Sequence, residues 1–194
     1  MVPPPLDDAL ELRRHKFTAD EFMRMDALGI LDSGVRDVRI ELLEGELIEQ
    51  RVMGDPHIVA VRRLTRLLVP VIGERAWVNV GLPIRASRYS VPYPDISLQP
   101  EPKSGSVIVP TPHLVIEVSD KSLRMDRILK QRIYAQAKVP EYWIVNLREL
   151  QIEVHEKPRG DDYTNRVVHP RDATLHIGKF PDVEVPFAEI LAGL

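Results

Sequence analysis

The chain has 194 residues, of which 44% are hydrophobic and 28% are charged, and its formal net charge is −3. These values predict one globular domain with enough apolar residues to build a core. The absence of cysteine excludes disulfides, thiolate nucleophiles and cysteine-based zinc sites, and it fits a cytoplasmic protein. The acidic balance counts against a protein that coats nucleic acid by charge alone, but less against an enzyme whose carboxylates bind a metal ion.

Neither a membrane span nor a secretory signal is expected. No apolar run approaches the roughly 20 residues that a membrane helix needs. Residues 1–8 (MVPPPLDD) lack the basic start and apolar core of a signal peptide. We expect residues 1–16 to form an N-terminal tail and residues 17–194 to form the domain.

The N-terminal half predicts a helix, a hairpin and a second helix. The segment Thr18–Glu21 has the spacing of a capping box, so a helix is expected from there to Gly29. Residues 38–52 indicate a hairpin that turns at Glu44-Gly45. Beyond residue 55 the apolar residues take helical spacing. The residues expected on the buried face of this second helix are Ile58, Val61, Leu64, Leu68 and Val71.

The C-terminal half predicts strands around one long helix. Strands are expected at residues 76–86, 95–98, 114–118 and 142–145, a helix at 124–138, a more exposed strand at 152–155 and a short closing helix at 186–191. The segment 114–118 (LVIEV) is apolar on both sides of the pleat except for one glutamate, which is typical of a strand buried on both faces. This order of elements predicts an α/β fold, a mixed sheet flanked by helices.

Glu117 is the first candidate functional residue. A carboxylate within a buried strand is costly unless something compensates its charge. A metal ion, an arginine or lysine partner, or a position at the strand end near solvent could each compensate it, and the spacing alone does not choose among the three.

Asp95 is the second candidate, although an aspartate after proline is commonly just a turn residue. The interval from Asp95 to Glu117 suits two adjacent strands joined by a loop, so the two carboxylates could converge on one ion. Magnesium prefers oxygen ligands in an octahedron and keeps several waters. The two carboxylates and a backbone carbonyl such as that of Val118 would suit Mg²⁺, with Mn²⁺ as a substitute.

Asp126, Lys130 and Tyr134 follow at intervals of four residues on the predicted helix, and they therefore share one face. From spacing alone, the favoured interpretation is a salt bridge from Asp126 to Lys130, worth roughly a few tenths of a kcal/mol. The functional interpretation is that Lys130 faces the acidic site, where it orients an attacking water or balances the charge of a phosphate.

Two groups of arginines are candidates for contact with a polyanion. One lies on the second helix, where a solvated helix face is the commoner interpretation: Arg62, Arg63 and Arg66. The other flanks Lys130 and is better placed to steer a polyanion toward the acidic site: Arg124, Arg127 and Arg132. No glycine-rich phosphate loop, dinucleotide fingerprint or nucleophile elbow is present in the sequence.

Several motifs, taken in order, make the sequence recognisable. They are Ile40–Leu47 (IELLEGEL), His57, Pro94-Asp95, Leu114–Ser119 (LVIEVS), Asp126-x3-Lys130-x3-Tyr134 and Val139–Val145 (VPEYWIV). In this combination the chain resembles the Uma-two family of restriction endonuclease-like proteins, over about residues 17 to 192. The resemblance implies a restriction endonuclease-like fold of the PD-(D/E)XK nuclease type and metal-assisted hydrolysis of phosphodiester bonds in DNA.

The resemblance also implies roles for individual residues. Asp95 and Glu117 would be the metal ligands, and Glu41 would be the acidic residue from the early part of the fold. Lys130 would be the catalytic lysine, moved from the strand to the helix. His57 matches the histidine that opens the family's second helix, and a capping or packing role suits it at least as well as a catalytic one.

The sequence departs from the superfamily pattern at Ser119, where a lysine is usual two residues after the glutamate. Lys130 is our choice for the missing lysine and Lys121 is the rival. We expect Lys130→Ala to abolish cleavage and to leave the fold nearly intact. The family often reads Ser-Pro-Ser-Thr where this chain has residues 119–122 (SDKS), and this change could alter the loop beside the site.

Three functions are compatible with the sequence. The first is a Mg²⁺-dependent DNA endonuclease, expected to act as a homodimer because nuclease domains of this size often pair to reach both strands. The second is a nuclease fold with weak or no catalysis, kept as a binding or assembly module; the acidic net charge and the missing strand lysine favour it. The third is a hydrolase of smaller phosphoesters.

Overall fold

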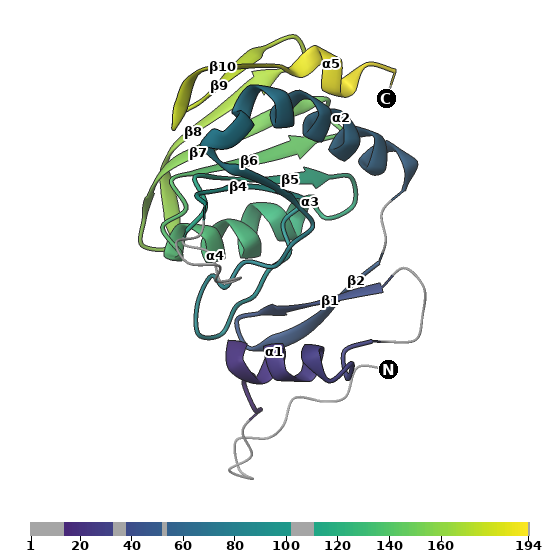
Figure 1. The fold of residues 1–194 in the computed structure, drawn as a ribbon, viewed down its shortest axis with the longest axis vertical. Coiled ribbons are helices and arrows are strands. Elements are labelled where there is room, and N and C mark those ends of the chain that lie inside the picture. Colours follow the sequence, from purple (N-terminus) through teal and green to yellow (C-terminus); the bar gives the residue numbers. More distant parts are fainter. Residues whose placement is uncertain (1–13, 33–37, 52–53, 102–110, 194) are drawn as a thin grey trace.

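A six-stranded mixed sheet forms the centre of the chain in the computed structural model, which describes residues 14–32, 38–51, 54–101 and 111–193 (Figure 1). The strand order is β3-β4-β5-β6-β7-β8, and β5 and β6 are the one parallel pair in this sheet. The strands span Trp77–Val80 (β3), Ile96–Gln99 (β4), Leu114–Ser119 (β5), Glu141–Asn146 (β6), Gln151–Arg159 (β7) and Asp162–Pro170 (β8). The predicted α/β class with a mixed sheet is confirmed.

Layers on both sides bury the central strands β5 and β6 completely (Figure 1). One layer contains α2 (Asp55–Ile72), α5 (Phe187–Leu191) and the hairpin of β9 (Thr174–Ile177) and β10 (Phe180–Pro186). The other layer contains the helical segments of residues 123–136. Among the residues that the structure describes, no helix is long and apolar enough to cross a membrane.

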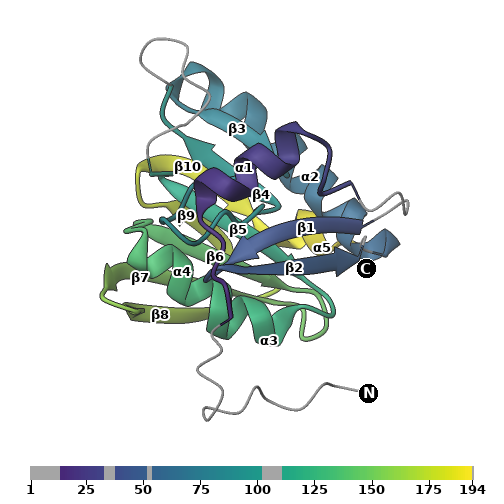
Figure 2. The ribbon, with the colours of Figure 1, turned by 90° about the horizontal axis from the view of Figure 1, so that it is seen from below.

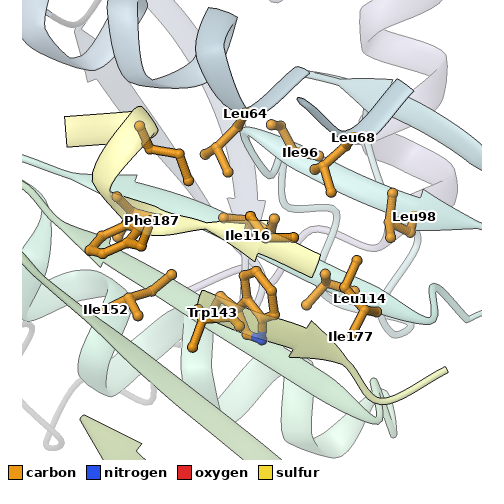
Figure 3. Close-up of a cluster of buried hydrophobic side chains, with 14 of the residues drawn as sticks. Leu64, Leu68, Ile96, Leu98, Leu114, Ile116, Trp143, Ile152, Ile177 and Phe187 are labelled. Atoms are coloured by element: carbon orange, nitrogen blue, oxygen red, sulfur yellow. The ribbon is translucent and has the colours of Figure 1, made fainter. Parts of the chain in front are cut away.

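Side chains alternate along β5 between these two layers, because successive residues of a strand point to opposite faces. Ile116 enters the larger hydrophobic cluster, together with Leu64 of α2 (Figure 3). Val115 enters a smaller cluster on the other side, together with Tyr134. Glu117, two residues after Val115, therefore points away from α2 and toward the opposite helical layer.

The prediction that residues 152–155 form a more exposed strand is wrong. These residues are buried because Ile152 and Val154 pack into the larger hydrophobic cluster and His155 packs against Tyr142 and Tyr163 on the other face. In addition, β8 pairs with β7, so β7 is not an edge strand. The sequence patterns do not predict β8, in which Tyr163 is the one buried residue and no clear alternation of apolar side chains exists. The β9–β10 hairpin is also absent from the predicted elements.

The buried face of α2 differs in part from the predicted one. Leu64 and Leu68 are fully buried as expected, but Ile58 and Val71 are 37% and 43% exposed. The face is rotated toward the residues His57, Ala60 and Ile72, which take the buried positions at the two ends of the helix. His57 can be buried because its imidazole has a carboxylate partner, described below.

A small lobe lies beside the sheet, on the side opposite α5 and the β9–β10 hairpin (Figures 1 and 2). It contains α1 (Ala19–Ala27) and the hairpin of β1 (Val38–Leu43) and β2 (Glu46–Arg51). The predicted capping box and hairpin are confirmed. The lobe has its own hydrophobic cluster, formed by Ala19, Phe22, Leu42 and Val91.

Two predictions extend beyond the residues that the structure describes. Residues 1–13 of the predicted tail lie outside them, and so does Val52 at the end of the predicted hairpin. The strand predicted for residues 76–86 is shorter than expected, because pairing in β3 ends at Val80. The chain then leaves the sheet and reaches the lobe, where Val91 N–H donates to the Leu42 carbonyl at 2.7 Å.

The helix predicted for residues 124–138 is present but interrupted. It consists of α3 (Leu123–Met125), a π-helical turn η3 (Asp126–Lys130) and α4 (Gln131–Gln136). In the π-helical turn, the Gln131 N–H donates to the Asp126 carbonyl, five residues earlier rather than four. The helical layer ends before Lys138, whose φ of 59° lies in the left-handed region.

We predict that Leu64→Ala lowers the free energy of unfolding by about 2–5 kcal/mol, because the side chain is fully buried in the larger cluster. Val69→Ala, on the solvent side of the same helix and 50% exposed, should change it by less than about 0.5 kcal/mol. Urea unfolding measures both values. Equal effects would contradict this placement of the buried face of α2.

Candidate active site

Four carboxyl groups and one ammonium group meet where the small lobe contacts the sheet. Glu41 comes from β1, Asp95 from the residue before β4, Glu117 from β5, and Asp126 and Lys130 from the π-helical turn. None of the five residues is more than 6% exposed. The structure thus brings together the four predicted catalytic residues, Glu41, Asp95, Glu117 and Lys130, and adds Asp126.

Lys130 compensates the charge of Glu117. Its Nζ donates to Glu117 Oε1 at 3.0 Å, and the Tyr134 hydroxyl donates to the same oxygen at 2.7 Å. Burial raises the pKa of Glu117 well above its ordinary value, although the charge of Lys130 opposes this effect. Of the compensations that the sequence left open for Glu117, a lysine partner is present.

The favoured sequence interpretation of Lys130, a simple salt bridge to Asp126, is wrong. Both ion pairs of Lys130 are long-range, to Glu117 on β5 and to Glu41 on β1. Burial by itself lowers the pKa of Lys130, but the charges of Glu117 and Glu41 outweigh burial and hold that pKa above its ordinary value. The lysine therefore stays charged inside the protein.

Glu41 is the contribution of the small lobe. Its carboxylate lies 3.4 Å from Lys130 Nζ. It also accepts the Gln50 side-chain N–H at 2.9 Å and the Tyr93 backbone N–H at 3.1 Å. Burial raises the pKa of Glu41, and Lys130 partly offsets this effect. Neither Gln50 nor Tyr93 carries a sequence signal that would have pointed to the site.

Asp95 is held through one of its two oxygens. Oδ2 accepts the backbone N–H of Val118 at 2.7 Å and lies 2.9 Å from Nε2 of His57. No described residue forms a hydrogen bond with Oδ1. The bond to Val118 shows that the expected approach of Asp95 to the Glu117 strand occurs, since β4 and β5 are adjacent antiparallel strands.

Asp126 follows the same pattern. Its Oδ2 accepts the hydroxyls of Ser119 and Ser122, both at 2.6 Å, and its Oδ1 is buried with no hydrogen-bond partner. Burial raises the pKa of Asp126. Ser119 thus occupies the position where the superfamily pattern has lysine and instead orients a further acidic residue. Spacing and family motif both singled out Asp126, but neither assigned it to the acidic site.

The donor chemistry of this cluster fits a divalent cation. Oxygen ligands are those that Mg²⁺ prefers, and Asp95 Oδ1, Glu117 Oε2 and Asp126 Oδ1 have no hydrogen bond from a described residue. One ammonium group stands against four carboxyl groups. Within the described ranges, no group of three or more His, Asp or Glu side chains is arranged so that it could hold a metal ion. The predicted set of Asp95, Glu117 and the Val118 carbonyl therefore stays a prediction.

Lys121, the rival for the missing lysine, is exposed on the loop after β5.

Of the arginines expected to steer a polyanion, Arg127 pairs with Glu153 and Arg132 pairs with Glu44, whereas Arg124 is exposed. Arg63 donates to backbone carbonyls at the end of α5, which gives it a structural role. The other two arginines that the sequence places on α2, Arg62 and Arg66, are exposed.

The fold and the acidic cluster together define a class, that of α/β proteins with a restriction endonuclease-like sheet. The chain belongs to the Uma2 family, whose model, described as "Putative restriction endonuclease", matches residues 19–188. The resemblance seen in the sequence motifs is thereby confirmed, and family and fold support a nuclease as the class of this protein.

A solved structure has the same fold. It is the crystal structure of a "putative nuclease" from Anabaena variabilis, with a TM-score of 0.68 and 15% sequence identity, covering 91% of this chain and 98% of that chain. At this identity the likeness establishes the fold alone. No curated protein matches the chain.

We predict that Lys130→Met lowers the free energy of unfolding by about 3–5 kcal/mol, because it leaves Glu117 and Glu41 buried without their charged partner. This replaces the sequence expectation that removing Lys130 leaves the fold nearly intact. Arg132→Met is the matched control, since its pair with Glu44 is about one-third exposed and should contribute at most about 1 kcal/mol. Chemical denaturation measures both variants, and an equal loss in the two would refute the central role of Lys130.

Proposed function

We propose that this protein is a metal-dependent endonuclease that hydrolyses phosphodiester bonds in DNA, with Mg²⁺ as the cofactor and Mn²⁺ as a substitute. The single observation that carries the proposal is the buried cluster of Asp95, Glu117 and Lys130 in a chain of the Uma2 family. The cluster combines oxygen donors for a cation with a charged lysine within the same site.

Asp95 Oδ1, Glu117 and the Val118 carbonyl are the proposed ligands. A magnesium ion held there would polarise the scissile phosphate and lower the pKa of a bound water. Lys130 would orient that water or balance the negative charge that develops on the phosphate. Glu41 contributes by holding Lys130 from the lobe side, at 3.4 Å. These roles give every member of the predicted catalytic set a separate task.

Access of DNA to this cluster requires contacts between the small lobe and the helical layer to open. The catalytic residues are buried, and two contacts outside the catalytic set link the lobe to the helical layer: Arg132 with Glu44, and Gln50 with Met125. The lobe has a hydrophobic cluster of its own, separate from the larger core. A proposed homodimer would bring two such sites to the two strands, and light scattering would measure this oligomeric state.

A binding or assembly module without catalysis is the second candidate, and one observation favours it. Lys130 already pairs with Glu117 and Glu41, so these buried carboxylates have a charged partner in the absence of an ion. On this alternative the protein would show no Asp95-dependent affinity for Mg²⁺ or Mn²⁺. A hydrolase of small phosphoesters is distinguished by offering nucleotides beside DNA.

We predict that the protein nicks supercoiled plasmid DNA in the presence of Mg²⁺ or Mn²⁺ and that Glu117→Gln removes the activity, because the variant loses a charged ligand. Gel electrophoresis of the plasmid measures the outcome. Glu153→Gln is the matched control, since Glu153 is also buried, pairs with Arg127 and lies in the same row of the sheet, with Ile144 between it and Glu117.

The control variant should nick at the wild-type rate if it folds. Nicking that persists in Glu117→Gln would exclude the proposed site. No nicking by the wild type with either metal would favour the binding module, and a metal titration of wild type and Asp95→Asn would then decide between the candidates.

A further inference from the structure

His57 is a buried polar residue in the acidic site to which the proposed mechanism gives no task. It is 6% exposed and lies in the first turn of α2, where its backbone N–H donates to the Gly54 carbonyl at 3.1 Å. Its Nε2 lies 2.9 Å from Asp95 Oδ2, and both side chains are 7% exposed. A neutral imidazole makes this contact as a donor when its proton is on Nε2.

The contact from His57 fixes the orientation of the Asp95 carboxylate. Two donors, the His57 imidazole and the Val118 backbone N–H, meet the same oxygen, Oδ2. A carboxylate held by two donors at one oxygen cannot turn about its own axis without losing both bonds. Oδ1 is therefore kept away from the donors and available as a ligand atom.

His57 is also held firmly in place by the fold. Ala60, Leu64 and Leu68 continue the buried face of α2 into the larger hydrophobic cluster. The helix is thus anchored on the sheet along its length, and its first turn delivers the imidazole to the site. Among the described residues, His57 is the one side chain that bonds Asp95, because the other donor belongs to the backbone.

We propose that His57 is a positioning residue, which orients Asp95 so that Oδ1 faces the metal ion. The proposal rests on the proposed function and deepens it. Residues that hydrogen-bond to metal ligands fix the orientation and basicity of those ligands, and their loss commonly weakens metal affinity or activity by 10- to 100-fold. A histidine buried only for packing would have no effect of this kind.

The test compares two amides that differ by one methylene. In His57→Gln, the amide nitrogen stands the same number of bonds from Cβ as Nε2 of histidine and can donate to Asp95. In His57→Asn, the same chemical group stands one bond short and cannot reach Oδ2. Mn²⁺ affinity of the wild type and both variants is measured by isothermal titration calorimetry, and thermal unfolding without metal checks that each variant is folded.

We expect His57→Gln to bind Mn²⁺ within about threefold of the wild type and His57→Asn to bind it about 10- to 100-fold more weakly. In the nicking assay, raising Mn²⁺ should recover part of the activity of His57→Asn, because the defect lies in binding the ion. Equal affinity of the two folded variants and the wild type overturns the role of His57 while the proposed function stands. A wild type that binds no Mn²⁺ overturns the metal site itself, and the role of His57 falls with it.

Discussion

The buried ion pairs of Lys130 are the interaction on which the rest of the site depends. Lys130 reaches Glu117 in the middle of the sheet and Glu41 on the small lobe, so one ammonium group joins the two parts of the protein. Removing charges from water costs free energy that only close partners recover. The positions of the helical layer, the central strand and the lobe are therefore coupled through this one side chain.

The elements that carry the site were largely predictable from the sequence. The apolar run around Glu117 indicated a strand buried on both faces, and the interval from Asp95 indicated an adjacent strand. Both predictions succeed because burial leaves a strong local pattern. Spacing alone gave the wrong partner for Lys130, since sequence distance cannot show that Glu41, 89 residues away, comes to lie beside it.

The errors have a common physical origin in tertiary context. Residues 152–155 alternate like a strand with one solvated face, but the larger hydrophobic cluster covers one face of β7 and the rings of Tyr142 and Tyr163 pack against His155 on the other. α2 exposes Ile58 and buries His57, against their hydrophobicity, because Asp95 offers the imidazole a hydrogen bond. In each case, segments that are distant in the sequence determine whether a residue is buried, and the pattern of its sequence neighbours does not show this.

The π-helical turn at Asp126–Lys130 has a consequence for how related chains are compared with this one. Its hydrogen bond joins an N–H to the carbonyl five residues earlier, whereas an α-helix joins residues four apart. The helix face that precedes Asp126 is therefore one residue out of step with the face that carries Tyr134. An alignment that treats residues 123–136 as one uninterrupted α-helix assigns the wrong positions to one of the two faces. A relative with a regular helix here would need a one-residue gap before its lysine and tyrosine could be matched to those of this site.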